Sequence, residues 1–346
     1  MTDIRLDEQE VRRQGTLARV LRWPIRHPPA FTLLLIVAVC LVVGTINPVF
    51  WQVSNLFDMA RASVVRGLFA MGVLSVLAAG GLDVSFTAIA ALTMYAITKG
   101  VFLWAPSLPM PFILLLAAVG GAGLGAGNGL LVDLLQAPSL IVTIGTQYAI
   151  RGFLLTFVGT ALFMNVPLAM DRFGKLALLT HRNAAGAVAQ LPAAVIVLLA
   201  AAVLTWWILE RTLIGRAIYA VGGSTSVAAR LGFNLRTVHV FVFAYAGLLA
   251  GVAGIMHVSL NRLANPFDLA GSELDVIAAV VLGGARINGG SGTVVGTLLG
   301  TVLITLVNNV LILVGIPSTW QFAIVGAFIV LAGLVFSIKT SHRVAA

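Results

Sequence analysis

Charged side chains are scarce in this chain of 346 residues. Asp, Glu, Lys and Arg together make up 10% of it, whereas 60% of the residues are hydrophobic. Soluble domains carry about 25% charged residues, so the composition excludes an ordinary soluble domain. Apolar segments of about 20 residues recur along the chain, which is the length a helix needs to cross a hydrocarbon core of about 30 Å. A transmembrane barrel would show alternating segments of about ten residues instead. We therefore predict an all-α, polytopic membrane protein.

Cysteine and the usual cofactor motifs are also nearly absent. Cys40 is the only cysteine, so no disulfide can form within the chain. The sequence contains no CxxC, HExxH or EF-hand pattern, and none of its three lysines lies in a P-loop, G-x-x-x-x-G-K-[ST]. The sequence shows no nucleophile–base pair and no metal-ligand set of the kind that an enzyme would need. We expect no cofactor in this chain, and any ATP and Mg²⁺ would be bound by a partner ATPase.

The formal net charge of +9 predicts topology rather than nucleic-acid binding. Its positive residues lie in short tails and loops between apolar runs, and such residues concentrate on the cytoplasmic side. The tail 1–29 is rich in arginine and has no signal-peptide cleavage site. The loop 211–237 and the tail 339–346 are basic as well. We expect all three on the cytoplasmic side, although the predicted outer loop 161–192, with Arg172, Lys175 and Arg182, runs against this rule.

Ten spans are predicted within a transmembrane domain at 30–338. The eighth is short for a spanning helix, so it is either a broken or a re-entrant segment. Broken segments survive in membranes only where protein or a water-filled cavity satisfies the backbone. The ten predicted spans are 30–47, 62–80, 85–104, 112–134, 139–160, 193–210, 238–259, 273–284, 292–314 and 319–338.

Glycine recurs at a four-residue period in three of these spans. Residues four apart share a helix face, and glycine lets two helix backbones approach closely. The pattern predicts a tightly packed bundle. The three series are Gly121, Gly125 and Gly129; Gly247 and Gly251; and Gly292, Gly296 and Gly300.

Two pairs of polar residues lie at the start of predicted spans. Asp83 and Ser85 follow a double glycine, and Glu273 and Asp275 precede the eighth span. Each pair fits helix capping, and each also fits a polar stretch of a solute path, because ionisable groups at membrane depth are expensive and often functional. Arg66 lies within the second span, where it either snorkels toward a headgroup, which we favour, or faces the interior of the bundle.

Further polar residues lie inside predicted spans. Gln147 and Arg151 share one helix face, with Thr143 nearby on the same helix. They form either a structural polar seam or part of a hydroxyl-rich solute path. Asn308 and Asn309 interrupt the ninth span, where their amides should find hydrogen-bond partners. The two amides either form hydrogen bonds between helices or contact the solute.

The loop 211–237 contains a signature of a short capped helix. Ser224, Thr225 or Ser226 can begin the helix, and Gly232 can end it. A plain surface loop has no need of a capped, alanine-rich turn between glycines, so we predict a docking helix for a cytoplasmic partner. The residues assigned to docking are Gly223, Ser224, Ser226, Ala229, Arg230, Leu231 and Gly232.

Several of these elements carry a family resemblance. Residues 80–85 read Gly-Gly-Leu-Asp-Val-Ser, residues 138–146 end in Thr-Ile-Gly-Thr, residues 215–223 read Gly-Arg-Ala-Ile-Tyr-Ala-Val-Gly-Gly, and residues 273–284 run from Glu-Leu-Asp to Gly-Gly. In order and spacing they resemble the permease subunit of bacterial ABC import systems of the ribose or simple-sugar type, from about residue 45 onward.

The resemblance implies a type II importer bundle in the bacterial inner membrane. It also implies a second permease copy or homologue, a cytoplasmic ABC ATPase that docks near 224–232, and a periplasmic solute-binding protein. The expected function is ATP-driven import of a monosaccharide, polyol or similar small polar solute by alternating access. The alternative is an ion-coupled secondary transporter, which predicts an acidic residue near the membrane midplane.

Overall fold

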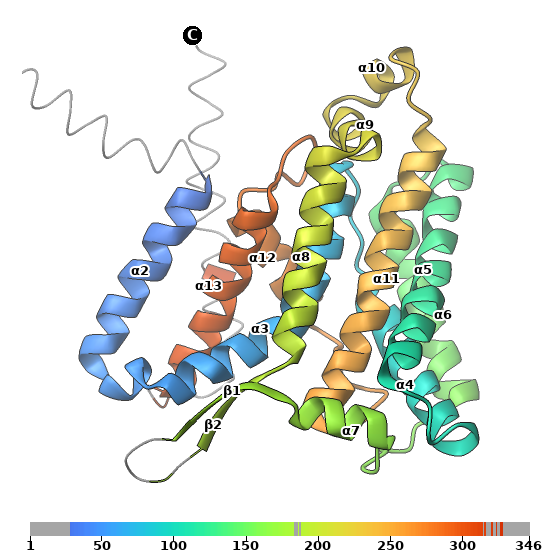
Figure 1. The fold of residues 1–346 in the computed structure, drawn as a ribbon. Coiled ribbons are helices and arrows are strands. Elements are labelled where there is room, and N and C mark those ends of the chain that lie inside the picture. Colours follow the sequence, from blue (N-terminus) through green and yellow to red (C-terminus); the bar gives the residue numbers. More distant parts are fainter. Residues whose placement is uncertain are drawn as a thin grey trace, which may run out of the picture.

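The computed structural model describes residues 28–182, 186, 188–313, 315, 320, 323, 326 and 327. The predicted tails 1–29 and 339–346 and the tenth span, 319–338, lie wholly or largely outside these residues. The described chain forms a bundle of long helices that run between two ends of the molecule (Figure 1).

Eight helices in the described part are long and apolar enough to cross a membrane. Each corresponds to a predicted span, but α3 begins at Val53, well before the predicted residue 62. The last turn of the fifth span is π-helical, at Leu154–Val158. The eight are α2 (Pro28–Ile46), α3 (Val53–Ala78), α4 (Phe86–Trp104), α5 (Met110–Leu135), α6 (Ser139–Phe153), α8 (Ala194–Arg211), α11 (Leu235–Asn261) and α13 (Val294–Leu313).

The predicted eighth span is the half-helix α12 (Glu273–Leu282). Its 10 residues rise only about 15 Å, half of a hydrocarbon core. The helix packs against α13 and α3 in the interior of the bundle (Figure 1). The helical part of the predicted eighth span is therefore too short to cross the membrane.

The two ends of the bundle carry different short elements (Figure 1). One end, called the α10 end, holds α9 (Leu213–Gly223) and α10 (Thr225–Arg230). The other, called the hairpin end, holds the 3₁₀ helix Pro48–Trp51, α7 (Leu168–Lys175) and an antiparallel hairpin of β1 (Ala177–Arg182) and β2 (Val188–Pro192). The predicted outer loop 161–192 contains α7 and this hairpin, and the described fold is otherwise helical.

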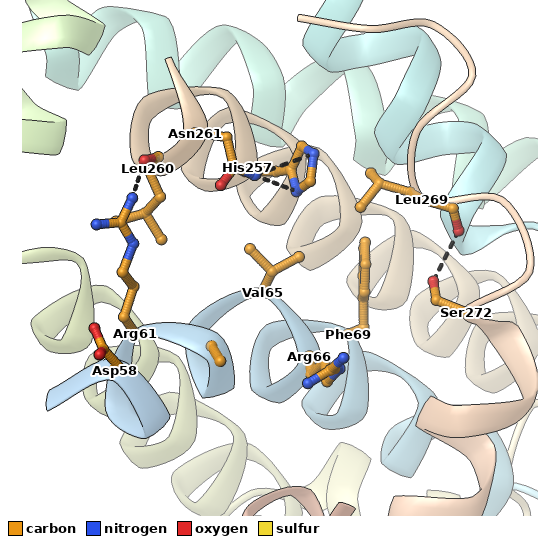
Figure 2. Close-up of a pocket in the computed structure, with 11 residues that line it drawn as sticks. Asp58, Arg61, Val65, Arg66, Phe69, His257, Leu260, Asn261, Leu269 and Ser272 are labelled. Atoms are coloured by element: carbon orange, nitrogen blue, oxygen red, sulfur yellow. Dashed lines mark hydrogen bonds between the residues drawn. The ribbon is translucent and has the colours of Figure 1, made fainter. Parts of the chain in front are cut away.

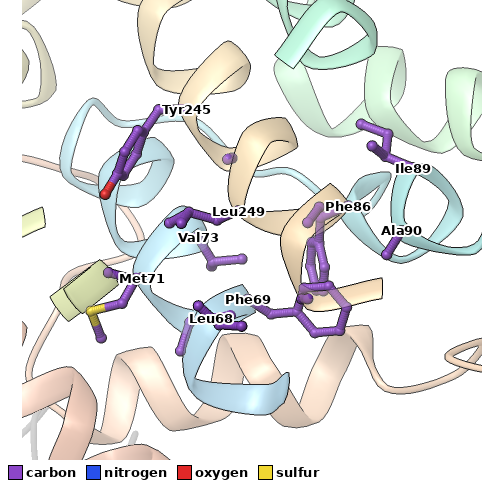
Figure 3. Packing of buried hydrophobic residues seen from close by; sticks show 14 of the residues in the cluster. Leu68, Phe69, Met71, Val73, Phe86, Ile89, Ala90, Tyr245 and Leu249 are labelled. Carbon is purple, nitrogen blue, oxygen red and sulfur yellow. The ribbon is translucent and has the colours of Figure 1, made fainter. Parts of the chain in front are cut away.

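Helix α3 runs through the middle of the bundle. Of the residues in its most apolar stretch, 72% are buried. Leu68 and Val73 are among the fully buried ones. Figure 3 shows Val73 beside Leu249 of α11, and Phe69 beside Phe86 of α4. The core of the molecule is thus built around α3 and α11.

The predicted glycine faces bring helix backbones into contact. A Cβ added at Gly121 would overlap the carbonyl of Gly247, and one added at Gly125 would overlap the carbonyl of Phe243. In α13, Gly296 and Gly300 meet α12 in the same way. The prediction of tight packing is confirmed for these positions. Gly292, however, precedes α13 and lies in the loop with φ +149°, so it is not part of a helix face.

We expect Gly121→Val to destabilise the protein, because the new side chain would force α5 away from α11. Overpacking of this kind costs roughly 1–3 kcal/mol. Gly123→Val is the matched control, because Gly123 lies two residues away on the same helix and an added Cβ there meets nothing. Thermal unfolding in detergent should show a lower midpoint for Gly121→Val alone. Equal midpoints for the two variants would contradict the packing account.

Candidate functional site

The segment 79–85 turns back into the bundle after α3 ends at Ala78. The ring of Phe86, the first residue of α4, lies 5.0 Å from the ring of Phe69. Phe69 precedes the end of α3 by nine residues, which corresponds to about 13 Å of helix. The segment therefore descends from the α10 end to the interior, where α4 begins. We call it the descending segment.

Side chains of α6 satisfy the backbone of the descending segment. The Leu82 N–H donates to Ser139 Oγ at 2.8 Å, and the Val84 N–H to Thr143 Oγ1 at 3.4 Å. The Thr143 hydroxyl also lies 3.4 Å from the carbonyl oxygen of Leu82. Non-helical backbone at membrane depth requires such partners. Thr143, predicted as a seam or path residue, acts here as a backbone partner.

Asp83 and Ser85 are bonded to each other and fully enclosed. The Ser85 N–H and hydroxyl both donate to Asp83 Oδ1, at 2.7 and 2.6 Å, and Asn128 Nδ2 donates to Ser85 Oγ at 2.7 Å. Asp83 is 1% exposed and Ser85 0%. The Asp83 side chain therefore holds the turn that leads into α4, and Asn128 ties that turn to α5.

A second set of polar side chains surrounds Glu273, at the start of α12. Its Oε1 accepts hydrogen bonds from Thr87 Oγ1 of α4, from Gln147 Nε2 at 2.7 Å and from Arg151 Nη2 at 3.1 Å. Three helices, α4, α6 and α12, thus meet at one carboxylate. We call Thr87, Gln147, Arg151 and Glu273 the Glu273 cluster.

The Glu273 cluster contains a partly shielded ion pair. The side chains of Glu273 and Arg151 are 12% and 30% exposed. A carboxylate in such a place is tolerated when it is paired and hydrogen-bonded, and Glu273 has both an ion pair and two neutral donors. The cluster therefore anchors the free end of the half-helix α12 while leaving part of Arg151 accessible.

Other predicted path residues do not join this cluster. Asp275 interacts electrostatically with Arg66 of α3, away from Glu273. Asn308 and Asn309 lie on α13, and within the described residues their buried Oδ1 atoms have no hydrogen-bond partner. The hydrogen bonds expected for these two amides are thus not seen in this part of the chain.

Sequence reading missed Thr87, Asn128 and Ser139. Each is a small polar residue at or near a helix start or inside an apolar helix, a feature too common to single out. Their importance comes from the partners that the fold gives them: Glu273, Ser85 and the Leu82 backbone.

The predicted docking helix is present at the α10 end. Ser224 caps α10, since its side chain accepts from the Val227 N–H, and Gly232 follows the helix with φ +84°. Ala228 is buried and holds α10 to the bundle, whereas Val227 and Leu231 are 51% and 67% exposed. The predicted start and end of this short helix are confirmed. The remaining docking residues, Gly223, Ser226, Ala229 and Arg230, are exposed beside them.

Glycines of α9 and of two loops meet at the α10 end. The Gly290 N–H donates to the Ala78 carbonyl at 3.0 Å, and Cβ atoms added at Gly222 or Gly289 would overlap neighbouring backbone. Tyr219 of α9 also donates its hydroxyl to the Gly292 carbonyl at 2.8 Å. We call Gly80, Gly222, Gly289 and Gly290 the glycine junction. It connects α9, the descending segment and the loop that follows α12.

These features define a polytopic membrane transport protein. A descending segment and a half-helix meet inside a bundle of spanning helices, and ionisable groups at that depth are typical of solute paths.

Comparisons with known proteins place the chain in a family. The sequence model of a family described as branched-chain amino acid transport system / permease component matches residues 55–333. The ribose import permease protein RbsC of Escherichia coli (strain K12) is 31% identical over 90% of this chain and 94% of that protein. The probable ABC transporter permease protein YphD of the same strain is 32% identical, over 93% of both chains. The autoinducer 2 import system permease protein LsrC of Enterobacter sp. (strain 638) is 32% identical, over 90% of this chain and 88% of that protein.

The chain belongs to this family of permease components of ABC import systems. No solved structure matches it at a significant level. It is a multi-pass membrane transport subunit rather than an enzyme, and such a component works with an ATPase and a solute-binding protein.

The ion pair of the Glu273 cluster can be tested by a double-mutant cycle. We expect Arg151→Gln and Glu273→Gln each to lower stability and the double variant to lower it by less than their sum, because each single change leaves a shielded charge unpaired. A coupling of roughly 1–3 kcal/mol is expected for contacting residues of this kind. Thermal or denaturant unfolding in detergent provides the measurement.

The matched control for this cycle is the exposed pair Asp171–Lys175 of α7. An i,i+4 pair in water couples by about 0.3–0.5 kcal/mol, so its cycle should be nearly additive. Additive behaviour of the Arg151–Glu273 cycle as well would show that the membrane-depth pair does not anchor α12.

Proposed function

We propose that this chain is the permease of an ATP-driven importer of a monosaccharide, polyol or similar small polar solute. The observation that carries the proposal is its likeness, over 90% of its length, to a protein named for ribose import. The Glu273 cluster supports it, because a charge-balanced set of donors and acceptors suits an uncharged polar solute. Family membership does not favour the ion-coupled alternative.

We place the solute path beside α6. The outer face of α6 and of the π-helical turn that follows it is apolar and uncovered: Ile141, Tyr148 and Phe157 are 65%, 73% and 75% exposed. A second permease copy packed on this face would bring Gln147 and Arg151 of each copy close to the shared interface. Asp83, Ser85 and Thr143 support the path as its wall, while Asp275, Asn308 and Asn309 lie outside the Glu273 cluster.

The α10 end is the proposed cytoplasmic face, to which the ATPase docks. Arg211, Arg216, Arg230 and Arg236 lie at this end, in agreement with the positive-inside rule. Both tails are placed on the same side. The ATPase, not this chain, supplies the site for ATP and Mg²⁺, and the solute-binding protein delivers solute at the hairpin end, which faces the periplasm in this orientation.

The glycine junction offers a route from docking to the solute path. A displacement of α10 moves α9, and α9 contacts the descending segment and the loop after α12 through closely packed backbone and the Tyr219 hydroxyl. Those two segments lead directly to Asp83 and to the Glu273 cluster. Close-packed backbones transmit displacement because no side chain can rotate to absorb it.

Reconstitution tests the proposed function. Proteoliposomes would hold this chain with the ATPase and binding protein encoded beside it, and uptake of labelled pentoses, hexoses and polyols would be measured. We expect uptake of at least one of them that requires ATP and resists a protonophore. Uptake without the ATPase that a protonophore abolishes would support the ion-coupled alternative instead.

Docking is tested by Leu231→Asp. A carboxylate placed on this exposed apolar side chain should be costly to bury against the ATPase, so we expect about tenfold less ATPase to co-purify, equivalent to about 1.4 kcal/mol. Leu179→Asp is the control, because Leu179 is similarly exposed (60%) but lies on the hairpin. Equal losses in both variants, or none in either, would contradict docking at α10.

Transmission is tested by Gly222→Ala. The added methyl would overlap the Ala78 carbonyl and the Gly290 nitrogen, whereas an alanine at Gly123 of α5 meets nothing. We expect Gly222→Ala to lower ATP-driven uptake several-fold while the ATPase still co-purifies, and Gly123→Ala to leave uptake near that of the parent. Unchanged uptake in Gly222→Ala would show that the glycine junction does not carry the movement.

A further inference from the structure

A cavity of about 460 Å³ lies at the hairpin end, apart from the Glu273 cluster. Its walls are α3, the last turn of α11 and the loop that leads into α12 (Figure 2). Small-molecule sites typically have volumes of about 300–1,000 Å³. The cavity is therefore large enough for a small solute. We call it the α3 cavity.

One face of α3 forms the floor of the α3 cavity. Asp58, Arg61, Val65, Arg66 and Phe69 recur at three- and four-residue spacing and all line it (Figure 2). Charged residues in a membrane helix are costly unless they face protein or a water-filled cavity. Arg66, for which snorkelling toward a headgroup is favoured on sequence, lines this cavity in the structure.

Arg66 has hydrogen-bonding capacity to spare. Within the described residues its guanidinium makes no hydrogen bond or close ion pair, and only a longer-range attraction to Asp275 acts on it. The neighbouring groups are committed by contrast: Arg61 donates to the Leu260 carbonyl, and His257 Nε2 lies 3.0 Å from Asp268 Oδ2. The five N–H donors of an arginine fork suit oxygen acceptors on a ligand.

Charges of both signs surround the cavity. Arg61, Arg66 and Asp58 line it. Asp275 attracts Arg66, and Asp268 Oδ2 lies 3.0 Å from Nε2 of the lining residue His257. Donors and acceptors coexist, from Arg66, Asp58, Asn261 and Ser272, beside apolar walls. This mixture matches a neutral ring or chain that carries several hydroxyl groups.

We propose that the α3 cavity binds a monosaccharide or polyol within the permease itself, with Arg66 as its principal hydrogen-bond donor. The choice of solute class rests on the proposed function, but the site rests on the cavity. Ser272 lines the cavity and the next residue, Glu273, belongs to the Glu273 cluster. The first turn of α12 therefore lies between the two sites. A movement of this turn would let solute pass from the cavity to the Glu273 cluster.

The test is protection of a cysteine in the cavity wall. In full-length protein with Cys40→Ser, Ala62→Cys places a thiol at an exposed position that lines the cavity. The rate of maleimide labelling is measured with D-ribose, D-xylose, D-glucose, glycerol or sodium sulfate. We expect at least one sugar or polyol to slow labelling about threefold or more at a concentration above its Kd, and sulfate to have no effect. Leu179→Cys on the hairpin should show no protection.

Two arginine variants locate the site. Arg66→Gln should abolish the protection, whereas Arg61→Gln should retain most of it, because the Arg61 side chain is already bonded to Leu260. Arg66→Lys, which keeps the charge, should retain part of it. Unprotected labelling rates and unfolding midpoints close to the parent's show that each variant is folded.

The outcomes separate this proposal from the importer assignment. If no solute protects, if sulfate protects best, or if Arg66→Gln keeps full protection in a folded protein, the cavity does not bind sugar, even where ATP-driven uptake is observed. Protection that depends on Arg66 supports the cavity whether or not uptake follows. Failure of uptake with all the sugars tests only the importer assignment.

Discussion

The fold depends on how backbone polar groups are satisfied at membrane depth. A descending segment and a half-helix both end inside the bundle, where water is not available to their N–H and C=O groups. Ser139 and Thr143 satisfy the first, and Glu273 anchors the second through Thr87, Gln147 and Arg151. Both solutions use side chains of α6, and they require α6 to lie beside both segments.

Close backbone approach is the second organising constraint. Lipid supplies no hydrophobic drive for one helix to prefer another, so packing distance decides which helices associate. Glycine faces on α5 and α11 remove the side chains that would separate these two helices, which form a closely packed pair. At the glycine junction, the backbone of α9 lies directly against the descending segment and the loop after α12.

Each of the two acidic residues at the start of α12 interacts with an arginine. Arg151 faces Glu273 and Arg66 faces Asp275, so that α12 has an arginine on each side of its first turn. Such compensation lowers the cost of each ion at low dielectric. It also makes the start of α12 sensitive to any movement that separates the partners.

The sequence by itself determined the helical membrane class, the edges of most spans, the packing role of Gly121 and Gly296, and the short helix that starts at Ser224 and ends before Gly232. These follow from hydropathy, helical period and capping, which act between residues near in sequence. Only the tertiary structure decided that Glu273 meets Gln147, 126 residues away, that Thr143 serves the backbone of Leu82, and that Arg66 lines a cavity. It also placed Asn308 and Asn309 away from the Glu273 cluster. Helical periodicity tells which residues share a face, but the partner of that face is set by packing among all the helices at once.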